Sequence, residues 1–193
     1  MELITPTLQT YRLQLLGDAM SPEHEMARDF CLATIKEVYG IDYTPDWHAD
    51  LDSLLLGSGS WFSSGNRGAF YTARDPDGVL VATVGMYDLA LKPSTWTRLS
   101  NRYSGGEKVC QLVRAYVRKD RRGGGLGTML ADAAETHAKN IGYDVVYLHA
   151  DAKADRTLKF WASAGYHEFG QVTYPSATGT DTSVDFDKPL GSA

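Results

Sequence analysis

Residues 117–127 read Val-Arg-Lys-Asp-Arg-Arg-Gly-Gly-Gly-Leu-Gly, and this stretch with its two flanks decides the fold class. The apolar run from Val109 to Val117 predicts a strand. From Leu126 to Ile141, apolar residues recur at spacings of three and four, which predicts an amphipathic helix that ends at Gly142. A strand, a glycine-rich turn and a helix therefore follow one another directly.

The turn from Arg122 to Gly127 is the strongest candidate for a binding site. Glycine adopts positive φ and lets a ligand approach the backbone, and the first N–H groups of a helix lack intrahelical partners, so together they favour an anion such as a pyrophosphate. The alternative is a flexible surface loop. Two familiar phosphate motifs are not met. Thr128 rather than Lys follows Gly127, and neither Thr128 nor Leu130 supplies the third glycine of a dinucleotide-binding loop.

Short strands and helices flank this segment on both sides. Ser21-Pro22-Glu23 predicts the start of a helix that ends at Gly40. The turn formers Asp75-Pro76-Asp77-Gly78 predict a hairpin. The other predicted strands cover 8–16, 68–73, 79–87, 145–150, 167–174 and 182–186, further helices cover 50–56 and 154–164, and 92–108 is predicted to be a polar loop. This order predicts an α/β layer with a mixed sheet.

The composition predicts one soluble globular domain over residues 1–193, because 43% of the residues are hydrophobic and 22% are charged. The formal net charge of −5 argues against binding to nucleic acid or to an anionic membrane. Cys31 and Cys110 are far apart in segments expected to be buried, which argues against a disulfide framework or a cysteine-rich zinc site and predicts a cytoplasmic location. We expect no targeting segment and no membrane anchor.

Two motifs resemble those of the GCN5-related N-acetyltransferase (GNAT) superfamily. Arg122-Gly123-Gly124-Gly125-Leu126-Gly127, which begins five residues after Val117, resembles the family's Arg-x-x-Gly-x-Gly segment, which binds acetyl-CoA and opens a helix. Phe160 to Tyr166 resembles the family's aromatic-x-x-x-Gly-aromatic helix end. The resemblance implies the GNAT fold, an α/β (α+β) fold with a central mixed, mostly antiparallel sheet of about seven strands flanked by about four helices.

The resemblance also implies which residues hold acetyl-CoA, and it implies no metal ion. The backbone of Ala115, Tyr116 and Val117 is expected to hold the pantetheine arm and the acetyl carbonyl, and the Val117 N–H would stabilise negative charge on that carbonyl during attack. Trp161 is assigned to the same cofactor site, because it aligns with the tyrosine that often protonates the departing thiolate. The residues expected to wrap the pyrophosphate are Arg122, Gly123, Gly124, Gly125, Leu126 and Gly127.

Three positions depart from the family pattern. Gln111 stands where the family often has a glutamate, and Ala154 stands where many members have a cofactor-binding asparagine. The indole N–H of Trp161 donates hydrogen bonds but has no usable acidity. The usual general acid is therefore missing. The thiolate of coenzyme A, with a thiol pKa of about 8.5, is expected to leave with help from water or another hydroxyl.

His149 is the candidate general base. It falls where some family members place a catalytic glutamate, and a neutral imidazole takes a proton from an amine at physiological pH, directly or through water. The alternative is a histidine that only satisfies the end of a strand. Asp151 lies on the same strand face and is expected either to orient His149 or to bind a cationic substrate. His137 lies on the apolar stripe of its helix and is expected to pack in the core.

The acceptor pocket is predicted from two segments that shape it in the family. Tyr43, Trp47 and His48 are the candidate substrate-binding residues, since aromatic rings stack on an acceptor, although packing at a helix junction is the alternative. Arg98 and Arg102 offer guanidinium groups for a substrate carboxylate or phosphate, and a solvated loop face is the simpler interpretation of both.

These residues together predict an acetyl-CoA-dependent N-acetyltransferase. The acetyl group is expected to pass to a primary amine, preferably of a small molecule, by direct attack in a ternary complex, because neither cysteine lies in the motif. One alternative is a non-catalytic acyl-CoA-binding or sensing module. Another is an acetyltransferase that acts on a protein amine. The expected partner is the small-molecule amine, with no nucleic acid and no membrane, and a homodimer is left open.

Overall fold

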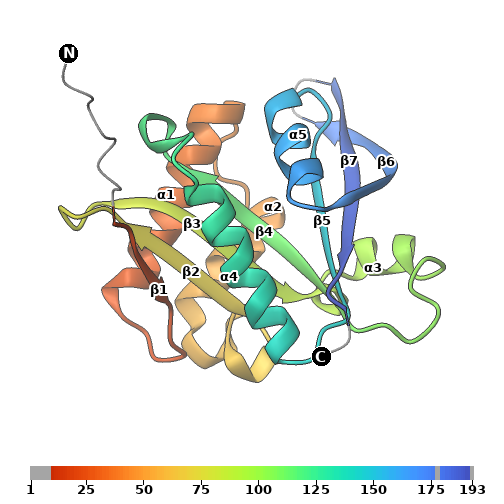
Figure 1. Ribbon diagram of the computed structural model, residues 1–193, viewed down its shortest axis with the longest axis horizontal. Coiled ribbons are helices and arrows are strands. Elements are labelled where there is room, and N and C mark those ends of the chain that lie inside the picture. The colour runs from red at the N-terminus through yellow and green to blue at the C-terminus, as the bar shows by residue number, and fades with distance from the viewer. Residues whose placement is uncertain (1–9, 177–178, 192–193) are drawn as a thin grey trace, which may run out of the picture.

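The computed structural model describes residues 10–176 and 179–191, and a seven-stranded sheet runs through it (Figure 1). The strand order is β1-β2-β3-β4-β5-β7-β6, in which β4 and β5 run parallel and the other neighbours run antiparallel. The strands are β1 Arg12–Leu15, β2 Ala69–Arg74, β3 Leu80–Asp88, β4 Val109–Val117, β5 Val145–Asp151, β6 His167–Ser176 and β7 Gly179–Pro189. The mixed, mostly antiparallel sheet predicted from the sequence is confirmed. Residues 8 and 9 of the first predicted strand lie outside the described residues.

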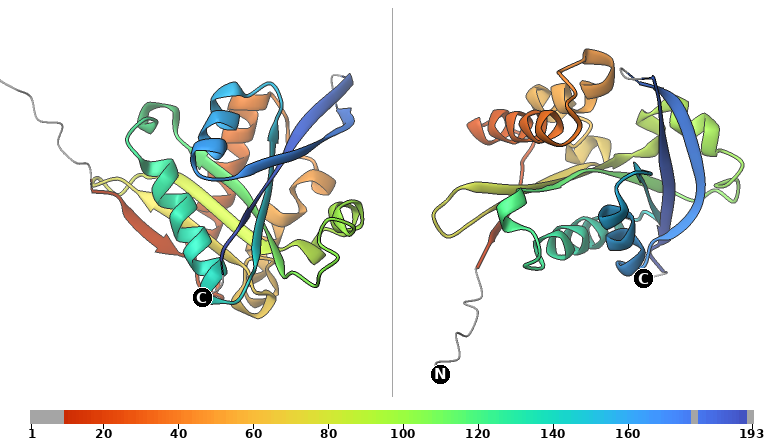
Figure 2. Two further views of the ribbon diagram at one scale, coloured as in Figure 1. Left: turned by 45° about the vertical axis from the view of Figure 1, so that its right-hand side comes forward. Right: turned by 90° about the horizontal axis from the view of Figure 1, so that it is seen from above.

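Helices cover both faces of the sheet (Figure 2). The α-helices are α1 Pro22–Tyr39, α2 Pro45–Ser53, α3 Pro93–Leu99, α4 Leu126–Asn140 and α5 Asp155–Ser163, and short 3-10 helices cover Leu54–Gly59, Ser64–Asn66, Leu89–Leu91 and Lys119–Arg121. α1 and α3 lie on one face, and α4 and α5 lie on the other.

Two helices differ from the prediction. α3 lies inside the stretch 92–108 that the sequence predicts to be a loop, so the described chain has one α-helix more than expected. The prediction fails here because a seven-residue helix is too short to show an apolar period. α2 begins at Pro45 and not at Asp50, after a Thr44-Pro45-Asp46 start that combines a cap residue, a proline and an acid, as in α1.

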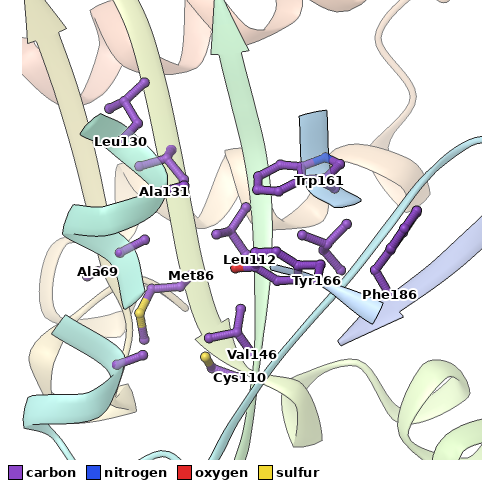
Figure 3. Packing of buried hydrophobic residues seen from close by; sticks show 14 of the residues in the cluster. Ala69, Met86, Cys110, Leu112, Leu130, Ala131, Val146, Trp161, Tyr166 and Phe186 are labelled. Atoms are coloured by element: carbon purple, nitrogen blue, oxygen red, sulfur yellow. The ribbon is translucent and has the colours of Figure 1, made fainter. Parts of the chain in front are cut away.

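The core lies in two layers, one on each face of the sheet. Figure 3 shows the larger cluster, in which α4 and α5 cover the apolar side chains of β4, β5 and β7, among them Leu112, Val146 and Phe186. The second cluster lies under α1. Cys31 and Cys110 are buried free thiols in these layers. Across residues 10–176 and 179–191, no helix has both the length and the apolar character needed to cross a membrane.

Two irregularities of β4 shape the region between the helices. β4 pairs with β5 only over Val109 to Gln111, and beyond that point the two parallel strands diverge. β4 also carries a bulge on its other edge, where Arg114 is the extra residue in the register with β3 and has a φ of 52°. The Thr83 hydroxyl donates to the Arg114 carbonyl at 2.9 Å, which holds the bulge in place.

Candidate active site

The opening between the diverging ends of β4 and β5 exposes one edge of β4. The opposite edge stays paired with β3 as far as Val117, and the N–H of Arg118 donates to Val81 on that side. Because successive N–H groups along a strand point to opposite edges, the N–H of Val117 points into the opening. Ala115 is exposed there, and Tyr116 is half-buried. This edge therefore offers main-chain hydrogen bonds to an extended ligand.

The glycine turn continues this edge and leads into α4. Gly125 caps the helix with a φ of 79°, no side chain caps the first turn, and the first turn contains no acidic residue. A Cβ placed on Gly123, Gly124 or Gly125 would meet no atom within 4 Å, so the space over the turn is open. The uncapped N–H groups at this end of α4 fit an anion such as a pyrophosphate. Leu126 is buried and contributes only its backbone.

Arg122 is the guanidinium of this turn that is not paired with a carboxylate in the described structure. Its Nε donates to the Val117 carbonyl at 2.9 Å, which ties the turn to the end of β4. Arg118 is paired with Asp120, and Arg121 with the buried Asp75. Arg122 is therefore the arginine available for a phosphate group.

Gly127 faces α5 across the helix contact. A Cβ at this position would lie 3.4 Å from the ring of Phe160 on α5, which is an ordinary van der Waals contact, so helix packing does not by itself require glycine here.

His149 lies on β5 with its Nδ1 3.4 Å from both the Tyr147 hydroxyl and the Gln111 amide nitrogen. His149 is an exposed residue, and neighbouring protein atoms replace part of the water around its ring. That desolvation lowers the pKa of His149 to about 4, with Asp185 opposing the change and Arg98 adding to it. The imidazole is therefore neutral at pH 7 and able to accept a proton. Gln111, which the resemblance aligned with the family's glutamate, is an uncharged neighbour of this imidazole.

Arg98 and Arg102 do not match either interpretation of them from the sequence. Arg98 donates to both oxygens of Asp185 at 2.5 and 2.9 Å, and the Nε of Arg102 donates to Asp187 at 2.6 Å. Both carboxylates are buried on β7. The two guanidinium groups are thus neither free for a substrate nor simply solvated, because they anchor α3 and the following loop to the sheet.

The three residues predicted to bind the acceptor substrate differ in their exposure to solvent. Tyr43 and Trp47 are exposed, and the Tyr43 hydroxyl donates to Asp52 at 2.8 Å. His48 is only 3% exposed, and its Nδ1 lies 2.9 Å from the backbone nitrogen of Thr44, in the first turn of α2. His48 therefore stabilises the start of α2, and only Tyr43 and Trp47 present surface to an acceptor.

A buried ion pair joins α2 to the bulge of β4, and no pattern in the sequence indicates it. Arg114 donates to both oxygens of Asp50 at 2.6 and 2.8 Å, and to the Trp47 carbonyl at 3.1 Å. The side chains of Asp50 and Arg114 are 5% and 16% exposed. The pair fixes the left-handed backbone of Arg114 and the position of Trp47 together.

Asp50→Asn is expected to lower the free energy of unfolding by about 3–5 kcal/mol, because it leaves a buried guanidinium without its counter-charge. Urea unfolding measures the change. The matched control is Asp52→Asn in the same helix, whose partner Arg28 pairs with it nearer the surface, and it is expected to cost at most about 1 kcal/mol. Equal losses in the two variants would contradict this account.

Trp161 lies on the buried face of α5 and packs in the core. It is 5% exposed, and its ring meets Tyr166 edge-on at 5.1 Å and Phe160 at 4.8 Å (Figure 3). A contact with a cofactor would therefore involve only the small exposed part of the indole. Ala154 caps α5 without a side-chain hydrogen bond.

His137 is remote from this opening. It is half-buried near the other end of α4, where its Nδ1 lies 2.9 Å from the Tyr71 hydroxyl and a cavity of about 170 Å³ opens beside it. In the part of the chain that the structure describes, no three His, Cys, Asp or Glu side chains are grouped so that they would hold a metal ion.

The seven-stranded sheet, the opening between β4 and β5 and the glycine turn agree with the GNAT fold that the two sequence motifs predicted. Residues 32–166, more than half of the chain, match the family described as Acetyltransferase (GNAT) family. The chain belongs to this family, and the resemblance inferred from the two motifs is confirmed.

Individual relatives are distant. N-alpha-acetyltransferase 60 of Xenopus tropicalis is 23% identical over an alignment of 154 positions that covers 73% of this chain and 57% of that protein, so the chain spans little more than half of the relative. The structure of Arabidopsis thaliana NAA60 in complex with acetyl-CoA has a TM-score of 0.68 and 15% identity over 93% of this chain and 98% of that one. FeeM, an N-acyl amino acid synthase from uncultured soil microbes, has a TM-score of 0.69 and 13% identity over 96% and 93%.

Proposed function

We propose that this chain transfers an acetyl group from acetyl-CoA to a primary amine by direct attack in a ternary complex. The observation that carries the proposal is the open edge of β4 that leads to the uncapped start of α4, with His149 on the facing strand. The fold is shared with NAA60, which was solved with acetyl-CoA.

Each part of this site has a role in the proposed reaction. The edge from Ala115 to Val117 holds the pantetheine arm, and the turn from Arg122 to Gly127 holds the pyrophosphate. The Val117 N–H stabilises negative charge on the carbonyl oxygen during attack. As the nitrogen–carbon bond forms and the carbon–sulfur bond breaks, His149 takes the proton from the amine and releases it to solvent. The thiolate leaves without a tyrosine acid, because Trp161 occupies that position in the core.

The first candidate acceptor is a small-molecule amine, which Tyr43 and Trp47 would contact with their exposed rings. A protein α-amine is the second candidate, and the similarity to N-alpha-acetyltransferase 60 favours it. A non-catalytic acyl-CoA-binding module is the alternative to both, motivated by Trp161. One domain over 1–193, a cytoplasmic location and a homodimer stay predictions.

Acetyl-CoA is expected to stabilise the protein by about 2.7 kcal/mol at a concentration 100 times its Kd. Thermal unfolding with and without acetyl-CoA measures this, and thiol release across a panel of small amines and peptides then identifies the acceptor class. Stabilisation with thiol release supports the enzyme. Stabilisation without release from any amine supports the binding module, and the absence of stabilisation contradicts the cofactor site.

A further inference from the structure

A chain of polar contacts leads from α3 to His149. Arg98 donates from Nη1 and Nη2 to the two oxygens of Asp185, and from Nη2 to the Tyr147 hydroxyl at 2.9 Å. The Tyr147 hydroxyl donates to Asp185 at 2.7 Å and lies 3.4 Å from the Nδ1 of His149. Asp185 is 1% exposed and is the direct cross-strand neighbour of His149. These four residues form one connected network.

The positions of the protons in this network determine whether the Tyr147 hydroxyl donates to the Nδ1 of His149 or accepts from it. Both oxygens of Asp185 accept from Arg98, and the Tyr147 hydroxyl also donates to Asp185, so the single hydroxyl proton of Tyr147 points to that carboxylate. The oxygen of Tyr147 is left as an acceptor, and it favours the tautomer of His149 with its proton on Nδ1. The lone pair of Nε2 is then free to accept a proton.

Gln111 is compatible with a proton on the Nδ1 of His149 when its side-chain amide oxygen, and not its nitrogen, faces that atom. Its side-chain oxygen lies 3.3 Å from the Tyr87 hydroxyl, and its nitrogen lies 3.4 Å from the Nδ1 of His149. The oxygen and nitrogen of an amide are assigned from hydrogen bonding, and exchanging them makes Gln111 a second acceptor for the Nδ1 proton and a donor to Tyr87.

The charges around His149 are largely balanced before any substrate arrives. Asp185 is the carboxylate directly opposite the ring, and Arg98 neutralises it. The ionisable and charged groups that face the ring are Arg98 on α3, Lys92 before α3, Arg114 on β4, Asp185 on β7, and Tyr147 and Asp151 on β5. Arg98 is paired with Asp185 and Arg114 with Asp50, so Lys92 and Asp151 are the two charges in this set without an ion-pair partner in the described residues. The charges that face the ring therefore nearly cancel, and desolvation of the ring favours its neutral form.

Building on the proposed role of His149 as base, we propose that Arg98, Asp185 and Tyr147 are positioning residues. They fix the tautomer of His149 with its Nδ1 proton toward Tyr147, and Arg98 keeps the ring uncharged by neutralising Asp185. α3, which the sequence did not predict, is the element that supplies Arg98.

The loop that follows α3 contains a second arginine–tyrosine pair, which serves as a control. It anchors this segment to β7 but, among the described residues, has no hydrogen bond to His149. Arg102 and Tyr103 both donate to Asp187, at 2.6 and 3.1 Å, two residues along β7 from Asp185. This second arrangement ties the α3 segment to the same strand with the same residue types. Within the described chain it contacts Asp187 and Phe169 and makes no hydrogen bond to His149.

The test is an NMR titration of the His149 ring in the protein without donor or acceptor. Arg98→Gln is expected to raise the pKa of His149 by roughly one unit or more, because Asp185 is left with an unbalanced charge. Arg98→Lys, which keeps the charge, is expected to restore most of the original titration. Arg102→Gln is expected to leave the titration unchanged. Equal shifts in Arg98→Gln and Arg102→Gln, or no shift in either, would overturn the proposal.

Tyr147→Phe tests the tautomer while removing a single oxygen atom. In this variant, the ¹⁵N chemical shifts of the His149 ring are expected to move away from the values of the tautomer with its proton on Nδ1. In Tyr103→Phe these shifts are expected to stay unchanged. An unchanged tautomer in Tyr147→Phe would contradict the positioning role. Because these measurements need no turnover, they remain decisive if the proposed acetyl transfer fails. If transfer is found, the acid limb of kcat/KM should move to higher pH in Arg98→Gln.

Discussion

His149→Ala is expected to lower turnover by about 10²–10⁴-fold, the range associated with a positioned general base, and to leave the affinity for acetyl-CoA unchanged. In the proposed mechanism the ring of His149 acts on the acceptor amine, whereas the edge of β4 and the glycine turn hold the donor. Thiol release at saturating acceptor measures the first quantity, and titration calorimetry with acetyl-CoA measures the second. A loss of turnover without a loss of donor affinity is the signature of the base.

Two controls accompany this variant. His149→Gln keeps a polar side chain but removes the base, so it should be as slow as His149→Ala. His137→Ala changes a half-buried histidine near the other end of α4 and should keep normal turnover. Because the pKa of His149 is lowered to about 4, the wild-type acid limb should lie well below pH 6.5. Wild-type turnover in His149→Ala would remove the histidine from the mechanism.

Gly125→Trp is expected to weaken acetyl-CoA binding by at least about 100-fold, which corresponds to about 2.7 kcal/mol. The indole would extend into the open space over the uncapped start of α4, where the pyrophosphate is proposed to lie. The thermal shift with acetyl-CoA should disappear, while the protein still unfolds cooperatively.

Gly142→Trp is the matched control for this variant. Gly142 follows the other end of α4 and has a φ of 83°, and a Cβ placed on it would also meet no atom within 4 Å. Both variants therefore impose the same left-handed backbone cost of roughly 1–2 kcal/mol, but only one faces the proposed donor site. Normal acetyl-CoA affinity in Gly125→Trp would contradict the assignment of the turn.

The sequence predicted the parts of the fold that depend on local patterns. The strand before Arg122, the glycine turn and the helix after it appear as expected, because apolar period and positive-φ glycines are properties of neighbouring residues. The start of α2 was predicted too late, at Asp50, although Thr44-Pro45-Asp46 carries a helix-start pattern. α3 was harder, since its seven residues carry no apolar period, and Pro93 was its main sign.

The ion pairs that organise the candidate site could not be predicted from the sequence, because they join residues far apart in the chain. Arg98 and Asp185 are 87 residues apart, and Arg114 and Asp50 are 64 apart. Such pairs depend on strand register and on the bulge of β4, which no spacing rule gives. His48 is buried at a kink in α2, which agrees with the alternative interpretation of packing at a helix junction and not with the predicted substrate contact.

The two buried cysteines matter for the thiol-release assay. Cys31 and Cys110 are fully buried, and burial raises the pKa of Cys31 to about 12 and that of Cys110 as well. A disulfide reagent reacts with thiolates, so the folded protein should be silent in a colorimetric thiol assay, and the colour that develops should come from released coenzyme A. In a sample without acetyl-CoA, the same reagent measures the fraction of protein molecules that have unfolded and exposed their thiols. Slow labelling of two thiols per chain would then report the unfolded fraction of each variant in the same cuvette.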